Sequence, residues 1–153
     1  MLNLRILTVN IVIRPARVTD IAAIFAIRTE VKENTLSLEQ LTEMGITPDA
    51  IQEMLELSGC IWVADVDGIT AGFTIVDLEE GSLFALFVLP EYEGLGLGRQ
   101  LMDSAETALF KQHSRVWLET DSQSRAAAFY LRRGWEAVEQ LAGTDKRYQK
   151  KRP

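Results

Sequence analysis

Three glycines at alternate positions are the residues of this chain whose type and spacing point most directly to chemistry. They lie in Glu93-Gly94-Leu95-Gly96-Leu97-Gly98-Arg99, between a predicted strand and a predicted helix. Glycines there let the backbone approach a ligand closely, and the first turn of a helix leaves amide N–H groups without partners. Together these features make a site for phosphate or pyrophosphate. A flexible strand-to-helix turn that binds nothing is the alternative.

Two other nucleotide-binding patterns fit this loop less well. A dinucleotide fingerprint needs G-x-G-x-x-G/A, but its last position falls on Arg99 or Leu101 in the two available registers. Glu119 lies about where a ribose-binding acid would stand, so this alternative stays open. Too little chain follows to complete a doubly wound sheet, however. A P-loop is excluded because no Gly-Lys-Ser/Thr follows the glycines.

Hydrophobic periodicity and cap residues predict the elements that position this loop. Strands are expected at 11–14, 60–66, 69–76, 83–89, 116–120 and from 135 to 138, with Tyr148 on or near a last one. Helices are expected after Thr19-Asp20, from the capping box Ser37-Leu38-Glu39-Gln40 to Gly45, after Thr47-Pro48, along Leu97, Leu101, Ala105 and Leu109, and from Ser124 to Arg133, with Gly134 ending the last.

The resulting order is β-α-α-β-β-β-α-β-α-β, with one more strand allowed at the end. It predicts an α/β fold (α+β by stricter usage) with a mixed, mostly antiparallel central sheet and flanking helices. Residues 60–89 should form an antiparallel meander, with Asp67-Gly68 as its first hairpin turn. Residues 83–120 should form a right-handed parallel crossover. With 153 residues, the chain is expected to be one domain, 1–153.

Two segments resemble motifs of the GNAT acetyltransferases. Residues 87–99, Phe-Val-Leu-Pro-Glu-Tyr-Glu-Gly-Leu-Gly-Leu-Gly-Arg, are similar to motif A, a strand ending in apolar-Val-x-Pro and then R/Q-x-x-G-x-G/A. Residues 126–135, Ala-Ala-Ala-Phe-Tyr-Leu-Arg-Arg-Gly-Trp, are similar to motif B, A-x-x-F/L-Y-x-x-x-G-F. Two motifs in the right order and separation are more specific than either alone. Glu93 departs from the usual Arg or Gln, and Gln123 from an Asn that often precedes motif B.

The resemblance implies a GNAT-like N-acetyltransferase, an acyltransferase for groups other than aminoacyl groups. Its acetyl-CoA would donate an acetyl group to an amine by direct attack, with no metal and no covalent enzyme intermediate. Val88 would supply a backbone oxyanion contact, and Tyr130 would act as general acid toward the thiolate. A buried tyrosine without a catalytic role is the alternative for Tyr130. Cofactor contacts would come from the backbone of Phe87, Val88 and Leu89 and from the loop of Gly94, Leu95, Gly96, Leu97, Gly98 and Arg99.

The sequence says less about the base and the acceptor. The strand at 83–89 contains no carboxylate, and surface roles explain Glu79, Glu80, Glu119 and His113 at least as well as proton abstraction. In this family the first helices and their connection usually form a wall of the acceptor site. Three polar residues there are candidates for substrate binding, although ordinary helix polarity explains them equally well: Arg28, Glu33 and Asn34.

Composition limits the partners. A net charge of −6, from 16 basic and 22 acidic residues, argues against a nucleic-acid surface and is weakly compatible with a cationic acceptor. No apolar stretch approaches about 18 residues, so no membrane span is expected. Without a signal-peptide pattern, and with Cys60 as the single cysteine and a packing residue, the chain is expected to be cytoplasmic.

Two functions of different classes therefore remain. The first is an N-acetyltransferase for a small-molecule or peptide amine, whose oligomeric state the sequence leaves open, although GNAT proteins are often homodimers. The second is a non-catalytic acyl-CoA-binding or sensing module, because Glu93 adds an acid to the loop and the preceding strand has no carboxylate.

Overall fold

The computed structural model describes residues 9–31, 36–57 and 59–153 and contains a seven-stranded sheet with the order β1-β2-β3-β4-β5-β7-β6. Its strands are β1 (Ile11–Pro15), β2 (Ile61–Val66), β3 (Ile69–Asp77), β4 (Ser82–Val88), β5 (Arg115–Asp121), β6 (Glu136–Gln140) and β7 (Asp145–Lys151). Its α-helices are α1 (Ile21–Glu30), α2 (Leu38–Glu43), α3 (Pro48–Glu56), α4 (Leu97–Gln112) and α5 (Arg125–Arg132), with 3₁₀ turns η1 (Val18–Asp20) and η2 (Pro90–Tyr92).

The pairing confirms the predicted fold class, a mixed and mostly antiparallel sheet with flanking helices. β4 and β5 run parallel, as predicted for the crossover through α4, and the other neighbouring strands run antiparallel. The predicted order counts two helices before β2, whereas the structure has three. The three starts predicted for this region do agree with it: helix α2 ends at Glu43, and Thr47 with Pro48 starts α3 as a separate helix.

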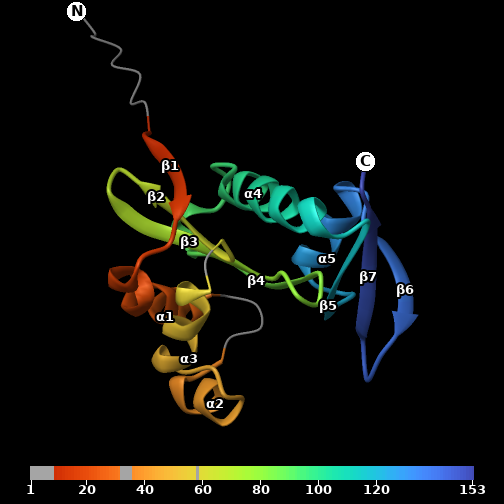
Figure 1. Cartoon of the computed structure of the whole chain (residues 1–153), viewed down its shortest axis with the longest axis horizontal. Helices are drawn as coiled ribbons and strands as arrows, with labels where there is room; N and C mark the ends of the chain where they lie inside the picture. The colour runs from red at the N-terminus through yellow and green to blue at the C-terminus, as the bar shows by residue number, and fades with distance from the viewer. Residues whose placement is uncertain (1–8, 32–35, 58) are drawn as a thin grey trace, which may run out of the picture.

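Helices cover opposite faces of the sheet (Figure 1). Phe73 of β3 faces α1–α3, since it lines a pocket together with residues of those helices. Its neighbour Gly72 faces α4, because a Cβ on Gly72 would lie 3.3 Å from Leu101 Cδ1. Neighbouring residues of a strand point to opposite faces, so α1–α3 and α4 lie on different sides. Helices α1–α3 lie at the β1–β4 end of the sheet, and β5, β7 and β6 form the other end.

Side-chain caps explain where three of the helices begin. The hydroxyl oxygens of Ser37, Thr47 and Ser124 accept hydrogen bonds from the backbone N–H groups three residues later, at 3.1, 3.2 and 3.1 Å. Each bond satisfies one amide that the helix leaves unpaired. The sequence predicts the caps at Ser37 and Thr47, and it predicts Ser124 as the start of a helix.

The cap predicted at Thr19-Asp20 is wrong. No side-chain cap hydrogen bond is made at Asp20, which ends the turn η1, and α1 starts at Ile21. The Asp20 carboxylate instead accepts two hydrogen bonds from the Arg14 guanidinium, both at 2.8 Å, and one from the Arg17 N–H at 2.7 Å. The carboxylate oxygens that would accept the hydrogen bonds of a helix cap are therefore bound by Arg14 of β1.

A buried carboxylate joins α4 to the C-terminal strands. Glu106 lies 2.8 Å from Arg133 Nε, 2.6 Å from Lys150 Nζ and 3.2 Å from Trp135 Nε1. Burial alone would raise the pKa of Glu106, but its hydrogen bonds with Arg133, Lys150 and Trp135 hold it below its usual value. These hydrogen bonds connect the second half of α4, far from the glycine loop, to the segments that contain Arg133, Trp135 and Lys150.

The structure also bears on two smaller predictions. Cys60 is buried, as expected for a packing residue, and its Sγ lies 3.1 Å from the Met54 carbonyl oxygen. Burial raises the pKa of this thiol. Within residues 9–31, 36–57 and 59–153, no helix has the length and apolar character to cross a membrane.

Candidate active site

The parallel strands β4 and β5 separate soon after they meet. Along both strands, which the structure describes completely, one position is paired, Ser82 with Trp117. The cause lies in β4. In its pairing with β3, Leu83 lies opposite Val76, and Ala85 lies opposite the next residue, Ile75. Phe84 therefore has no partner on β3 and forms a β-bulge. A bulge bends its strand and increases the local twist, which turns the rest of β4 away from β5.

This separation leaves backbone groups of β4 without a strand partner. The Leu89 N–H donates to the Ala71 carbonyl oxygen on β3 at 2.8 Å. Because backbone groups alternate in direction along a strand, the N–H and carbonyl of Val88 face the β5 side instead. Of the three predicted cofactor-contacting residues 87–89, Val88 is thus the one whose backbone points into the opening.

The glycine loop ends in a helix whose first amides have no side-chain cap. Gly94 and Gly96 adopt positive φ angles of 83° and 81°, a conformation that favours glycine. Gly96 occupies the N-cap position of α4, where no side chain accepts a hydrogen bond from the helix. Gln100 N–H bonds back to the Gly96 carbonyl oxygen at 3.2 Å, so the amides of residues 97–99 precede the first intrahelical bond. This end of α4 fits a phosphate group well.

An ion pair accompanies the loop. Glu93, the acid that departs from the motif, has its Oε1 3.0 Å from Arg125 Nη2, in the first turn of α5. The acid is therefore matched by a cation at the same place. Sequence reasoning missed this partner, because nothing near either residue in the chain indicates that the two meet.

Tyr130 lies close to this loop, because Phe129, the residue before it on α5, approaches Gly98. A Cβ on Gly98 would be 3.9 Å from the Phe129 ring, so the middle of α5 lies beside the start of α4. The Tyr130 side chain is 5% exposed and packs against the rings of Phe129 and Trp135, with centroids 5.5 and 6.1 Å away. Burial raises the pKa of its phenol. The hydroxyl therefore holds its proton at all ordinary pH values.

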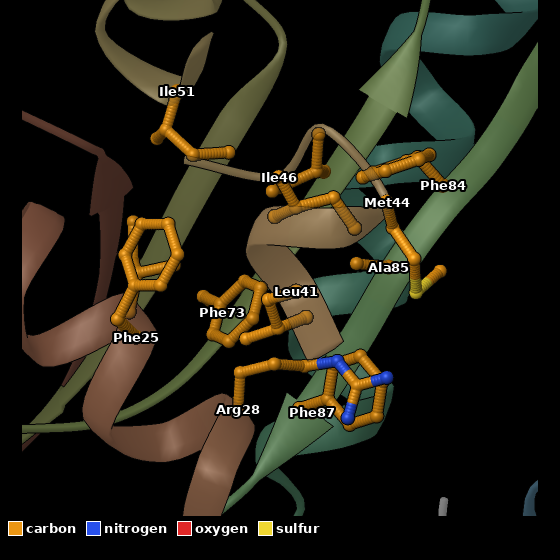
Figure 2. A pocket seen from close by; sticks show the side chains of 12 residues that line it. Phe25, Arg28, Leu41, Met44, Ile46, Ile51, Phe73, Phe84, Ala85 and Phe87 are labelled. Carbon is orange, nitrogen blue, oxygen red and sulfur yellow. The ribbon is translucent and has the colours of Figure 1, made fainter. Parts of the chain in front are cut away.

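An apolar pocket lies on the face of the sheet opposite α4, between β3, β4 and helices α1–α3 (Figure 2). Arg28, a predicted substrate-binding residue, lines it with its guanidinium 4.2 Å from the centre of the Phe87 ring. Burial lowers the pKa of Arg28. The other two residues predicted to bind substrate, Glu33 and Asn34, lie outside the described residues.

The structure separates the candidate bases. Glu79 and Glu80 precede β4, so its whole length, roughly 20 Å, separates them from Val88. Glu119 is on β5, but its Oε1 lies 2.6 Å from Arg147 Nη2. His113 follows α4, and its Nε2 contacts the Leu78 carbonyl oxygen. Of these four residues, Glu119 is therefore the one that lies where β4 and β5 have separated.

Two further observations complete the site. Gln123, which stands where the family often has Asn, is exposed, and its backbone N–H donates to Asp121 Oδ1 at 2.9 Å. Among the described residues, no group of three or more His, Cys, Asp or Glu side chains is placed to hold a metal ion.

Comparison with known proteins identifies the family. Residues 28–145 match the acetyltransferase (GNAT) domain, so this chain belongs to the GNAT family of acetyltransferases. The match includes the strand β4, the glycine loop and α5. The resemblance seen in the two motifs is thereby confirmed.

Solved structures share the fold at low sequence identity. PaiA N-acetyltransferase from Thermoplasma acidophilum, in complex with coenzyme A, has a TM-score of 0.76 and 21% identity, covering 94% of this chain and 99% of its own. The ribosomal-protein-S18-alanine N-acetyltransferase from Escherichia coli has a TM-score of 0.66 and 23% identity, with coverages of 92% and 91%. YncA, a putative acetyltransferase from Salmonella typhimurium with its cofactor acetyl-CoA, has a TM-score of 0.70 and 21% identity, with coverages of 92% and 93%.

Proposed function

We propose that this chain is an N-acetyltransferase that moves the acetyl group of acetyl-CoA to an amine. One observation carries the proposal: Val88, at the end of β4 that has separated from β5, is followed after a short connection by the uncapped N-terminus of α4. An extended thioester arm fits beside a strand with unpaired N–H and carbonyl groups. A pyrophosphate fits the amides at the end of that path.

The cofactor contacts follow from this placement. The pantetheine arm pairs with the backbone of Val88, and Phe87 and Leu89 flank it on β4. The pyrophosphate lies against Gly94–Arg99. Arg125 supplies a cation beside the loop, a role that the motif usually gives to position 93 and that Glu93 cannot fill.

The chemistry needs few residues. The amine nitrogen attacks the carbonyl carbon of the thioester, a C–N bond forms and the C–S bond breaks, and the electron pair leaves on the CoA sulfur. The Val88 N–H stabilises the negative charge that develops on the carbonyl oxygen, a contribution of about 3 kcal/mol in comparable sites. Tyr130 donates its hydroxyl proton to the departing thiolate and regains a proton from water, so that the phenol is neutral again after each turnover. The amine proton leaves through water, because Arg147 holds the Glu119 carboxylate.

A non-catalytic acyl-CoA-binding or sensing module is the second candidate. It is favoured by one observation, that β4 carries no acid and that Glu119 on β5 is already ion-paired. Such a protein would bind acetyl-CoA through the same loop but would release no CoA when an amine is added.

Two measurements test the proposal. Calorimetric titration with acetyl-CoA should give saturable binding, whereas NADH as a control should give none. A thiol-reactive dye should then report CoA release that depends on an added amine. Binding without amine-dependent release from a broad set of amines would favour the sensing module. No binding at millimolar acetyl-CoA would overturn both functions.

The proposal also keeps three expectations from the sequence. The reaction takes place in the cytoplasm, one domain over 1–153 carries it, and the acceptor is a small-molecule or peptide amine rather than a nucleic acid or membrane. Cell fractionation tests the location. Sedimentation of the purified protein tests whether it forms the homodimer that is frequent in this family.

A further inference from the structure

The pocket beside β4 has a composition that restricts what can enter it. Its volume is about 210 Å³. Phe25, Leu41 and Phe73 belong to its buried floor, while Met44 and Phe84 are 62% and 50% exposed. Eleven of its twelve lining residues are apolar: Ile24, Phe25, Leu41, Met44, Ile46, Ile51, Phe73, Ile75, Phe84, Ala85 and Phe87. Two large apolar side chains thus stay exposed at its mouth, where a bound apolar group could contact them.

The pocket opens beside the strand where the acetyl group is proposed to lie. Phe87 and Ala85 line it from β4, and Phe87 directly precedes Val88, so their Cα atoms are about 3.8 Å apart. Side chains alternate along a strand, so Phe87 faces the pocket while the side chain of Val88 packs with the core next to α4. A substituent close to the attacked nitrogen therefore lies within reach of the pocket.

The lining of the pocket disfavours one class of acceptor. The guanidinium of Arg28 lies over the Phe87 ring on the pocket wall (Figure 2). The other residues that line the pocket are apolar and offer no carboxylate to a second cation. Burying an ammonium group there without a partner is costly. The apolar wall therefore acts against a polycation.

We propose that this pocket binds a bulky apolar group attached close to the acceptor's amine, so that the enzyme selects hydrophobic primary amines over polyamines. This inference rests on the proposed function. The volume agrees, since an apolar cavity of about 150 Å³ already accepts benzene in another protein. A phenyl ring or a branched aliphatic chain therefore fits. A free amine or the first residue of a peptide could present this group.

The first test compares acceptors. CoA release is measured with peptides that begin with Phe, Leu, Ser or Lys and are otherwise identical, and with the free amines phenethylamine, isoamylamine, ethylamine and spermidine. We expect kcat/KM to be roughly 10- to 100-fold higher for the acceptors with apolar groups than for the others. Preference within the peptides or within the free amines shows which source supplies the group.

The second test changes the pocket. Ala85→Leu should fill part of it and lower kcat/KM for the Phe peptide or phenethylamine at least 10-fold, while smaller acceptors lose less. Met44→Gln removes an apolar side chain from the mouth and should raise KM for the preferred acceptor a few-fold. The matched control is Leu38→Gln, because Leu38 is 60% exposed at the start of α2 and does not line the pocket.

The outcomes are distinct. A preference for apolar acceptors that Ala85→Leu and Met44→Gln reduce, and Leu38→Gln does not, supports the proposal. Turnover that is fastest with spermidine or the Lys peptide overturns it and leaves the acetyltransferase function intact. Acetyl-CoA binding without release from any acceptor overturns the proposed function, and this inference with it.

Discussion

The carboxylate of Glu93 and the guanidinium of Arg125 lie 3.0 Å apart, although 32 residues separate them in the chain. Glu93 directly follows the turn η2 and begins the glycine loop, and Arg125 is the first residue of α5. The pair therefore connects α5 to the loop against which a pyrophosphate is proposed to lie. In the proposed site, Arg125 would offset the acid that stands in place of the usual cation.

The two residues should affect cofactor binding in opposite directions. Arg125→Ala leaves Glu93 unmatched beside the loop and should weaken acetyl-CoA binding roughly 10-fold. Glu93→Gln removes the acid and should strengthen binding a few-fold. Calorimetric titration of both variants and of the double variant measures their coupling. Glu91→Gln, an exposed acid two residues earlier, is the control and should not change Kd. Wild-type affinity in Arg125→Ala would remove Arg125 from the site.

Two glycines of the loop should respond differently to alanine. Gly96 has a φ of 81°, and its Cβ would lie 3.3 Å from Arg99 Nη2, so Gly96→Ala should cost about 1–2 kcal/mol of stability and disturb the cofactor site. Gly98 is helical, with 3.9 Å between its would-be Cβ and Phe129, so Gly98→Ala should raise stability slightly. Urea unfolding and acetyl-CoA titration of both variants check this. Equal losses in the two would show that φ is not the deciding property.

Tyr130→Phe should separate binding from turnover. Loss of the proton donor should lower kcat roughly 100-fold, while Kd for acetyl-CoA stays the same. Because burial raises the pKa of Tyr130, kcat should not fall on the alkaline side through this group below about pH 10. Tyr148→Phe removes another buried hydroxyl, on β7, and serves as the control for structural damage. Full turnover by Tyr130→Phe would leave Tyr130 a packing residue.

The same raised pKa has a consequence for stability. In the unfolded chain Tyr130 ionises near pH 10, whereas in the folded protein it keeps its proton to higher pH. Its contribution to the free energy of unfolding is therefore complete below about pH 10 and is lost as the pH rises further.

Glu106 should set the stability of the protein in acid. Its hydrogen bonds with Arg133, Lys150 and Trp135 hold its pKa below the usual value, so its contribution is present above about pH 4.3 and is lost as the pH falls through the folded pKa. Glu106→Gln leaves two cations incompletely paired and should cost about 3 kcal/mol at pH 7. Urea unfolding between pH 3 and 7 measures both effects.

Asp103→Asn is the matched control for Glu106. Asp103 contacts the same Arg133 at 2.9 Å, but its side chain is 58% exposed, so its loss should cost under about 1 kcal/mol. A larger loss for Asp103→Asn than for Glu106→Gln would contradict the ranking by burial.

Local signals in the sequence were sufficient for most of the fold. Ser37 and Thr47 cap helices as predicted, and the helix predicted from Ser124 begins directly after it. These predictions succeeded because each depends on residues a few positions apart. The cap predicted at Asp20 was wrong because it depended on a contact with a different element: Arg14 of β1 donates two hydrogen bonds to the Asp20 carboxylate.

The candidate site depended more on contacts between distant segments. The family motifs located the loop and Tyr130, and Arg28 does line a pocket. The bulge at Phe84 could not be read from the sequence, because it appears only in the pairing of β4 with β3. The contact between Glu93 and Arg125 and the position of Met44 at the mouth of the pocket likewise arise from packing, not from any local pattern.

The single paired position between β4 and β5 also changes how many strand edges the molecule has. A continuous sheet of these strands would end at β1 and β6, but the separation adds two internal edges, one along each diverging strand. Open edges are places where strands of other molecules can add and start aggregation. The irregular path of β4 at Phe84 makes one of these edges a poor template. A ligand seated between the strands would cover both, so the empty protein should be the more prone to self-association.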